Sequence, residues 1–200
     1  MKIIKHRINT IEGLVQIASN YGIEIDLRSK NGEIVLSHDP FPEESIHFTD
    51  WLKFYHHKTL VLNIKEEGLE QKVLEIMSSF EIQEFFFLDQ SFPFMMKSLK
   101  DGESRVAIRF SDQESFDTIF KISNLELVNP DWVWIDSFSG NWSHLSDLAK
   151  IKSLGFKVCL ASPELHGRNL DLELENIKTF FINSQFDAIC TKLPEKWLYT

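Results

Sequence analysis

The sequence predicts an α/β protein, a compact (β/α)₈ TIM barrel with a β-hairpin after the second strand. Eight strand-like apolar runs alternate with helical stretches, a pattern that favours parallel strands joined by helical crossovers. Every predicted strand ends in polar residues, as expected for a barrel whose functional groups lie at the carboxyl ends of its strands. Asn31-Gly32, between two strand-like runs, is typical of a two-residue hairpin turn.

The predicted elements follow one another with short connections. The first strand, Lys2–Lys5, precedes a helix that Thr10 can cap. Further strands are predicted over Gly22–Arg28, Thr59–Lys65, Glu84–Asp89, Arg105–Phe110, Trp132–Asp136, Lys157–Ala161 and Asp187–Thr191. Helices are predicted over Thr49–His57, Leu69–Phe80, Pro93–Lys100, Gln113–Ile122, His144–Leu154 and Asp171–Asn183. No linker divides the chain, so residues 1–200 are expected to form a single domain.

Composition excludes several classes of function. A chain of 200 residues with 43% apolar content can build one full core. Its net charge of −9 argues against a nucleic-acid partner, which needs a basic surface. No apolar run reaches the ~18 residues of a membrane span, and charges interrupt residues 1–7, so a cytoplasmic protein is expected. Cys159 and Cys190 lie in apolar runs and are expected to be buried, reduced thiols.

The hairpin gathers groups that can carry chemistry. Residues 23–28 alternate apolar with charged, so a strand would place Glu24 and Asp26 on one face, together with Arg28. With Asn31 and Gly32 in the turn, the return strand places Ser37 opposite Asp26 and brings His38 back to the level of the carboxylates. Two acids beside an imidazole are what a metal-assisted acid/base site requires.

Other strands also end in groups that could converge. On the third strand Val61, Asn63 and Lys65 share a face, and His6 follows the first strand. The same parity groups Phe85 and Phe87 with Asp89, and Trp132 and Trp134 with Asp136. Further polar residues at predicted strand ends are Asp89, Arg109, Asp136, Glu164 and Lys192, for which rim ion pairs are the simpler interpretation.

Taken in order, these motifs resemble the glycerophosphodiester phosphodiesterase family, one of the phosphatidylinositol-phospholipase-C-like barrels of lipid metabolism. The matching residues are His6-Arg7, Asn9-Thr10, Glu24-Ile25-Asp26, Asn31-Gly32, His38-Asp39 and Asn63-Ile64-Lys65. The segment from Asp187 to Pro194 is similar to the closing strand of that family. Each dipeptide alone is a weak signal, whereas the ordered set is specific.

The resemblance implies a site for phosphodiester hydrolysis. Glu24 and Asp26, with Asn63, would hold a divalent cation, Mg²⁺ or Ca²⁺, which oxygen ligands select. His6 and His38 would serve as general base and general acid. Arg7 and Lys65 would bind the substrate phosphate. In such families a neighbouring hydroxyl of the substrate is often the first nucleophile, giving a cyclic phosphodiester, a step that this sequence does not reveal.

The sequence departs from the pattern of this family at three places, which affect the cation site and the shape of the pocket. Asn63 stands where the family usually has a third metal-binding Glu, and Asp89 or Glu164 could compensate. Ile8 replaces the glycine after His-Arg, and only residues 40–48 separate Asp39 from the next helix, where the family has a sizeable insertion. A more open pocket is therefore expected.

Three interpretations of the function remain open. The first is a metal-dependent phosphodiesterase acting on a small-molecule or polymer-borne phosphodiester. The second, suggested by Asn63, is a catalytically reduced barrel that binds a phosphorylated ligand without cleaving it. The third is a hydrolase of non-phosphate substrates, since the fold alone does not determine function. The sequence does not indicate an oligomeric state.

Overall fold

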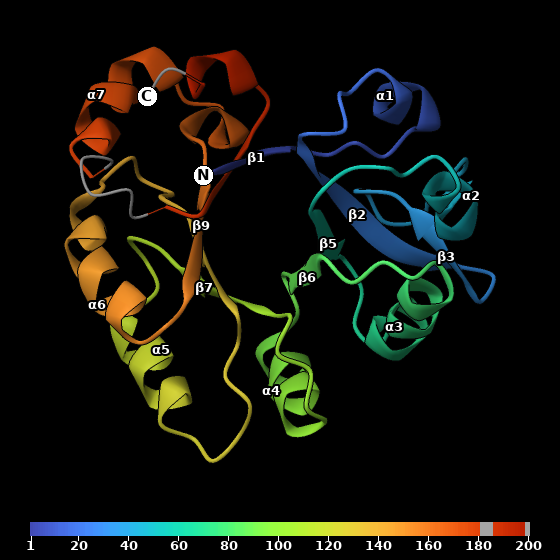
Figure 1. The fold of residues 1–200 in the computed structure, drawn as a ribbon, viewed down its shortest axis with the longest axis horizontal. Coiled ribbons are helices and arrows are strands. Elements are labelled where there is room, and N and C mark those ends of the chain that lie inside the picture. The colour runs from blue at the N-terminus through green and yellow to red at the C-terminus, as the bar shows by residue number, and fades with distance from the viewer. Residues whose placement is uncertain (181–185, 199–200) are drawn as a thin grey trace.

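The computed structural model describes residues 1–180 and 186–198, in which a ten-stranded sheet is surrounded by helices (Figure 1). The strands are β1 (Lys2–Lys5), β2 (Gly22–Lys30), β3 (Glu33–Leu36), β4 (Ile46–His47), β5 (Leu60–Ile64), β6 (Phe85–Leu88), β7 (Ala107–Phe110), β8 (Trp132–Ile135), β9 (Lys157–Ala161) and β10 (Ala188–Thr191). The helices are α1 (Ile11–Val15), α2 (Phe48–Leu52), α3 (Glu70–Ser79), α4 (Phe92–Lys100), α5 (Phe116–Ser123), α6 (Leu148–Ser153) and α7 (Leu170–Lys178).

Eight of these strands run parallel, as the alternation of elements predicts. Their order is β6-β5-β2-β1-β10-β9-β8-β7, so β6 and β7 stand at the two ends of the hydrogen-bonded ladders. These two strands meet through one isolated parallel bridge, Phe87–Val106, and the Phe87 amide donates to the Arg105 carbonyl at 2.8 Å. The α/β class and the succession of strands and helices are confirmed, and contact between the ends of the sheet rests on that bridge.

The predicted hairpin is present in its predicted register. Lys30 pairs with Glu33 and Leu27 with Leu36. Asn31 and Gly32 have φ of 52° and 81°, and positive φ at both positions is what a type I′ turn requires. The Ser37 amide donates to the Asp26 carbonyl at 3.1 Å, so the return strand reaches the level of the carboxylates. The sequence did not indicate β4, which adds a third antiparallel strand to the hairpin.

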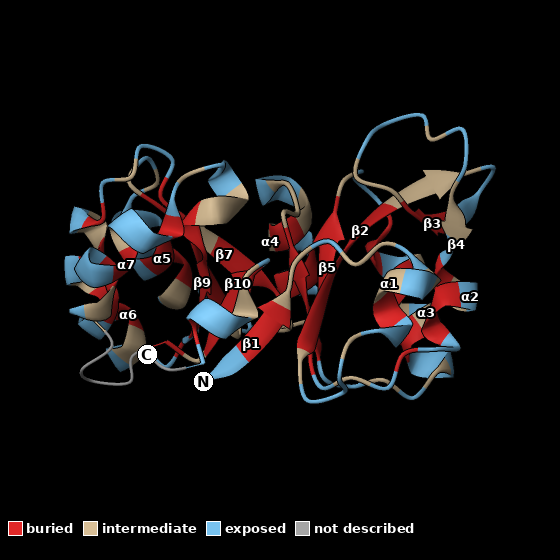
Figure 2. Ribbon diagram, turned by 90° about the horizontal axis from the view of Figure 1, so that it is seen from above, coloured by how far each residue is buried: buried red, intermediate tan, exposed pale blue. Residues whose placement is uncertain are grey.

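The strands bury one apolar layer on each side. The outer layer joins the strands to the helices and includes Ile25, Leu62 and Trp51. The inner layer consists of strand residues together with Leu165: Ile4, Val61, Phe86, Leu88, Ala107, Trp132, Trp134, Cys159, Ala161, Ala188 and Cys190. Both cysteines are buried and unbridged, as expected. Figure 2 shows the burial of the strands against the exposed outer faces of the helices.

Gly22 is required at the start of β2 because three strands approach closely there. A Cβ at this position would lie 2.9 Å from the Ile4 side chain and 3.0 Å from the Thr59 carbonyl oxygen. Any larger residue would push β2 away from β1 or β5. The glycine therefore keeps β2, which carries Glu24 and Asp26, in its register.

Several predicted helix boundaries were wrong. The helix predicted over Thr49–His57 ends at Leu52, and the helix predicted over His144–Leu154 divides into a 3₁₀ turn, Ser143–Asp147, and α6. Residues 181–183 of the last predicted helix lie outside the described residues. No helix of the described part of the chain has the length and apolar character that crossing a membrane requires.

The prediction that Phe85 and Phe87 share a face of β6 with Asp89 was also wrong. Phe86 and Leu88 belong to the inner layer, whereas Phe85 and Phe87 belong to the outer layer. Asp89 still reaches the carboxyl-end cavity described below, because its φ of 59° changes the direction of the chain where the strand ends.

Candidate active site

A cavity of about 210 Å³ opens at the carboxyl ends of the parallel strands. It is lined by His6, Arg7, Glu24, Asn63, Lys65, Leu88, Asp89, Arg109, Trp134, Asp136, Phe138, Ala161, Leu165 and His166. Five of the sequence-predicted site residues belong to this lining, and Asp26 lies directly behind it, 1% exposed. The prediction that the ends of separate strands meet at one place therefore describes the geometry correctly.

His6 follows β1 and is held over the sheet by its backbone. Its amide donates to the Thr191 carbonyl of β10 at 3.1 Å. The ring is largely buried: Nδ1 has no hydrogen-bond partner, and Nε2 lies 3.8 Å from Glu24 Oε2. Burial, together with the positive charges of Arg7 and Lys192, lowers the pKa of His6 to about 3. The imidazole is therefore neutral at pH 7, and the same surroundings make it a weak base in the cation-free protein.

Glu24 and Asp26 lie side by side on β2, each 1% exposed. Glu24 Oε2 accepts from the Arg7 amide at 2.6 Å, a contact that Arg7 reaches with a φ of 55°. Glu24 Oε1 accepts from Asn63 Nδ2 at 2.9 Å. Burial and the neighbouring Asp26 charge raise the pKa of Glu24 to about 7. Two adjacent buried carboxylates repel one another, and a positive charge between them would relieve that repulsion.

Asp26 is held by a reciprocal pair of hydrogen bonds with Asn9. The Asn9 amide donates to Asp26 Oδ2 at 2.8 Å, and the Asp26 backbone amide donates to Asn9 Oδ1 at 2.9 Å. Arg7 Nε lies 3.5 Å from Oδ2 and Lys65 Nζ 3.5 Å from Oδ1. Both cations stand near the limit of ion-pair distance from Asp26, and Lys65 also pairs with Asp89 at 3.2 Å.

The arrangement fits a cation bound by oxygen ligands. Asp26 Oδ1 and Asn63 Oδ1 are buried and make no hydrogen bond. Unsatisfied buried acceptors are costly, and two carboxylates with an amide oxygen are ligands that Mg²⁺ and Ca²⁺ accept. Within the described residues no three His, Cys, Asp or Glu side chains form such a group, because the third donor here is an amide.

His38 lies close to the cavity but outside its described lining. Its side chain is 40% exposed and its Nδ1 is 2.8 Å from Asp39 Oδ1. It is near enough for its charge to contribute to the lowered pKa of His6. Arg28 anchors this segment by donating to the His38 and Lys65 carbonyls, rather than pairing with the carboxylates of its own strand.

The opposite side of the cavity holds a chain of ion pairs. Asp89 Oδ2 lies 3.2 Å from Lys65 Nζ, and its Oδ1 lies 2.6 Å from Arg109 Nη1. Arg109 also pairs with Asp136, which in turn is 2.8 Å from His166 Nε2. No motif of the sequence singles out His166. The contact of His166 with Asp136, 30 residues earlier in the chain, is a tertiary contact that no local sequence pattern predicts.

Neither proposed substitute supplies the ligand that Asn63 lacks. Glu164 accepts from the Ser162 and Thr191 hydroxyls and from the Lys192 amide, and it is not part of the cavity lining. Asp89 is already neutralised by Lys65 and Arg109. Asp89 thus makes the ion pairs expected of a rim residue, and Glu164 makes hydrogen bonds to residues that follow β9 and to the end of β10.

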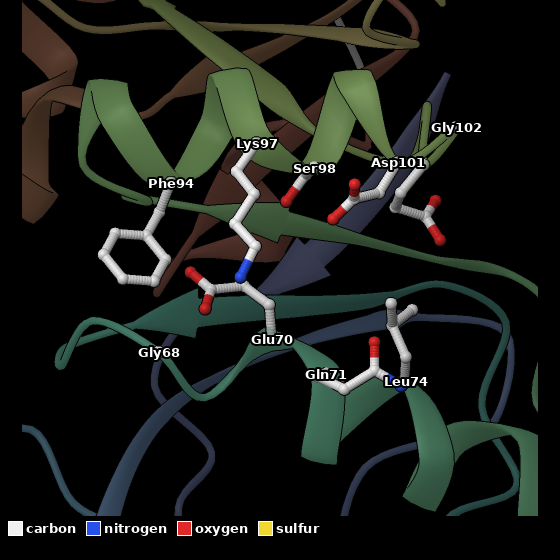
Figure 3. Close-up of a pocket in the computed structure, with 10 residues that line it drawn as sticks. Gly68, Glu70, Gln71, Leu74, Phe94, Lys97, Ser98, Asp101 and Gly102 are labelled. Carbon is white, nitrogen blue, oxygen red and sulfur yellow. The ribbon is translucent and has the colours of Figure 1, made fainter.

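A second hollow, of about 290 Å³, lies between α3 and α4 (Figure 3). Its lining shares no residue with the carboxyl-end cavity. Glu70 is its buried acid and accepts from Gln90 Nε2 at 3.3 Å. Figure 3 shows the Lys97 side chain extending toward Glu70. This groove lies between helices on the outside of the sheet, away from the predicted site residues.

The fold and the cavity define an α/β protein with acidic, basic and imidazole groups at the carboxyl ends of parallel strands. A solved structure of similar fold is the glycerophosphodiester phosphodiesterase from Agrobacterium tumefaciens. The two share 14% sequence identity with a TM-score of 0.64, over 95% of this chain and 96% of that one. No protein-family model and no curated protein sequence matches the chain. At this identity the likeness shows the fold alone.

Proposed function

We propose that this protein is a metal-dependent phosphodiester hydrolase on a closed (β/α)₈ barrel, resembling glycerophosphodiester phosphodiesterase. The observation that carries the proposal is the buried cluster of Glu24, Asp26 and Asn63, with two oxygens that lack hydrogen bonds, beside the neutral imidazole of His6. The substrate is a small-molecule or polymer-borne phosphodiester.

Glu24, Asp26 and Asn63 would hold Mg²⁺ or Ca²⁺. When bound, the cation supplies positive charge that stabilises the phosphoryl oxygens in the transition state. Arg7 and Lys65 bind the phosphate. Arg7 stands 3.5 Å from Asp26 and can shift toward a second anion, and Lys65 lies between Asp26 and Asp89 on the wall of the cavity.

His6 accepts a proton from the attacking hydroxyl group, of water or of the substrate, whose oxygen bonds to phosphorus as the bond from phosphorus to the departing oxygen breaks. A proton held at Nε2 lies beside Glu24 Oε2, 3.8 Å away, whose charge stabilises the imidazolium. His38 donates a proton to the departing oxygen, with Asp39 holding its Nδ1 at 2.8 Å. The exposed position of His38 means that substrate must cover it during the reaction.

The test is hydrolysis of a phosphodiester panel with Mg²⁺, with Ca²⁺ or with chelator, by the wild type and by His6→Ala and His38→Ala. We expect turnover that requires the cation and is lost in both variants. His56→Ala is the matched control, because His56 is exposed and precedes β5 at the opposite end of the strands. Turnover that survives chelation would contradict the role of the cation.

Asn63 favours one alternative, a reduced barrel that binds a phosphorylated ligand without cleaving it. An amide carries one negative charge fewer than the usual carboxylate, which weakens a cation site. This alternative requires saturable phosphodiester binding by folded protein, with no turnover under any cation. Calorimetric titration with the uncleaved diesters separates it from the hydrolase.

A further inference from the structure

The groove between α3 and α4 contains a buried carboxylate that has no cation partner. Glu70, the first residue of α3, lines this groove and is 8% exposed. Within the described residues its side chain makes no ion pair, and its one hydrogen bond, from Gln90 Nε2 to Oε1, is long at 3.3 Å. A carboxylate buried to this extent is usually paired, because water no longer compensates its charge.

Helix α3 compensates this charge only in part. Leu69, at the cap position, offers no side-chain acceptor, so the free amides of the first turn attract the Glu70 carboxylate through the helix dipole. In the part of the chain that the structure describes, none of those amides donates a hydrogen bond to it; its donor is Gln90, beyond β6. The carboxylate therefore retains the capacity to accept from a cation.

A cation without a partner faces Glu70 across the groove. Lys97 lies on α4 and is exposed. Among the described residues its side chain makes no ion pair or hydrogen bond, with Glu70 or with any other group. Figure 3 shows this side chain extending toward Glu70. The groove thus presents one negative and one positive group that do not neutralise each other.

The rest of the lining limits the size and the charge of a ligand. A volume of about 290 Å³ is near the lower limit for small-molecule sites, and Phe94 and Leu74 add apolar surface on either side of Glu70 (Figure 3). Glu103 pairs with Arg105, whereas Asp101 is exposed and has no ion pair among the described residues, so negative charge is in excess. No group of three His, Cys, Asp or Glu side chains in the described chain could hold a metal ion. The ligand that fits is a small organic molecule with an ammonium group.

We propose that this groove binds a small zwitterion of the α-amino acid type. Its ammonium group donates to Glu70, its carboxylate accepts from Lys97, and an apolar side chain contacts Phe94 or Leu74. Because negative charge is in excess, the ammonium group is the more tightly held of the two. The groove shares no lining residue with the carboxyl-end cavity, so this site does not depend on the proposed function.

NMR titration of ¹⁵N-labelled protein with three probes tests the proposal. The probes are L-leucine, N-acetyl-L-leucine, which lacks the ammonium group, and L-leucinamide, which lacks the carboxylate. L-leucine should shift amide signals of α3 and α4 with a Kd of about 1 mM or less, as expected for a ligand of this size. Loss of the ammonium group should weaken binding by roughly tenfold or more, and loss of the carboxylate by roughly three- to tenfold.

Two variants assign these preferences to the two side chains. In Glu70→Gln, L-leucine and N-acetyl-L-leucine should bind equally. In Lys97→Met, L-leucine and L-leucinamide should bind equally. Glu75→Gln and Lys100→Met are the matched controls, because they remove exposed charges from the same two helices outside the groove lining, and they should keep the wild-type order of the three probes.

Absence of saturable L-leucine binding up to about 10 mM, ten times the expected limit, overturns the proposal. Equal binding of the three probes by the wild type, or an unchanged order in Glu70→Gln, overturns it as well. Urea unfolding without ligand is the second measurement. Glu70→Gln should be at least as stable as the wild type, because it removes a buried charge that lacks a partner. A marked loss of stability would instead identify Glu70 as a structural group of α3.

Discussion

The two sides of the cavity contain similar polar residues, but they differ in how far those residues are paired with one another. On the side formed by β1, β2 and β5, three buried polar atoms have no hydrogen-bond partner: His6 Nδ1, Asp26 Oδ1 and Asn63 Oδ1. On the side formed by β6 to β9, the charges of Asp89, Arg109 and Asp136 are joined in one continuous series. Around the cavity, the first side therefore combines two buried carboxylates with unsatisfied acceptors, and the second carries a continuous series of ion pairs, in which Glu114 Oε2 also lacks a hydrogen bond.

This difference indicates that the two sides of the cavity contribute differently to function and to stability. Unsatisfied groups cost stability and are retained where a ligand satisfies them. Paired groups hold geometry and contribute to folding. Substitutions on the first side should therefore act on function, and those on the second side on stability.

The largest effect expected is on catalysis, from His6→Gln. Removing the proton acceptor should lower turnover by about 10²–10⁴-fold. The free energy of unfolding should change by no more than about 1 kcal/mol, because the buried Nδ1 has no hydrogen bond to lose. Steady-state kinetics and urea unfolding measure the two quantities. A severe loss of stability with intact turnover would reverse the comparison.

Arg109→Met tests the other side. It leaves Asp89 and the buried Asp136 without their shared cation, and breaking such a network should cost about 3 kcal/mol of unfolding free energy. Arg105→Met is the matched control. Among the described residues Arg105 forms an ion pair with Glu103 at the opposite edge of the sheet and lies over the Phe85 ring, and its loss should cost about 1 kcal/mol or less. Equal losses in urea unfolding would mean that the network has no special role.

Asn63→Glu tests whether the side of the cavity formed by β1, β2 and β5 binds a cation. A third carboxylate should tighten Mg²⁺ or Ca²⁺ binding by roughly tenfold or more. It should also destabilise the cation-free protein, because Glu24 and Asp26 already repel one another there. Calorimetric titration and thermal unfolding measure both effects. Asn63→Gln, which adds length without charge, should produce neither, and a similar gain in that variant would argue against a charge effect.

The pH dependence of stability should also change in cation-free protein. Because the pKa of Glu24 is raised to about 7 in the folded state, this group lowers stability as pH rises from its ordinary 4.5 to about 7. His6 acts in the opposite direction: its pKa falls from 6.5 to about 3, so stability rises with pH between those values.

The two contributions partly cancel in the wild type. Glu24→Gln removes the first and should give a steeper rise of unfolding free energy between pH 4.5 and 7. Urea unfolding across that interval, in the presence of chelator, is the measurement. Identical slopes in the variant and the wild type would show that Glu24 titrates normally.

Much of the fold could be predicted because its signals are local. The turn at Asn31-Gly32 and the cap at Thr10, which accepts from the Gly13 amide at 3.0 Å, depend on neighbouring residues alone. Element ends were less predictable, since tertiary contacts decide them. The second helix ends early, and the chain beyond it brings His57 Nε2 to within 3.0 Å of the Ile17 carbonyl oxygen, a contact between distant segments.

In the candidate site, too, some residues were placed correctly by local patterns and others were not. Alternation along a strand placed Glu24 and Asp26 on one face, and parity placed Asn63 and Lys65 beside them, because side-chain direction in a strand has a period of two. Parity did not apply to Asp89, whose positive φ breaks the period.

By itself the sequence determined the alternation of strands and helices, the hairpin and its register, and the shared face of Glu24 and Asp26 on β2. Only the tertiary structure decided that His166 meets Asp136, that Glu164 secures strand ends, and that His38 stands at the margin of the cavity. The reason is physical: strand periodicity and turn geometry act between near neighbours, whereas the partners of a charge at the end of a strand depend on how segments far apart in the chain come together.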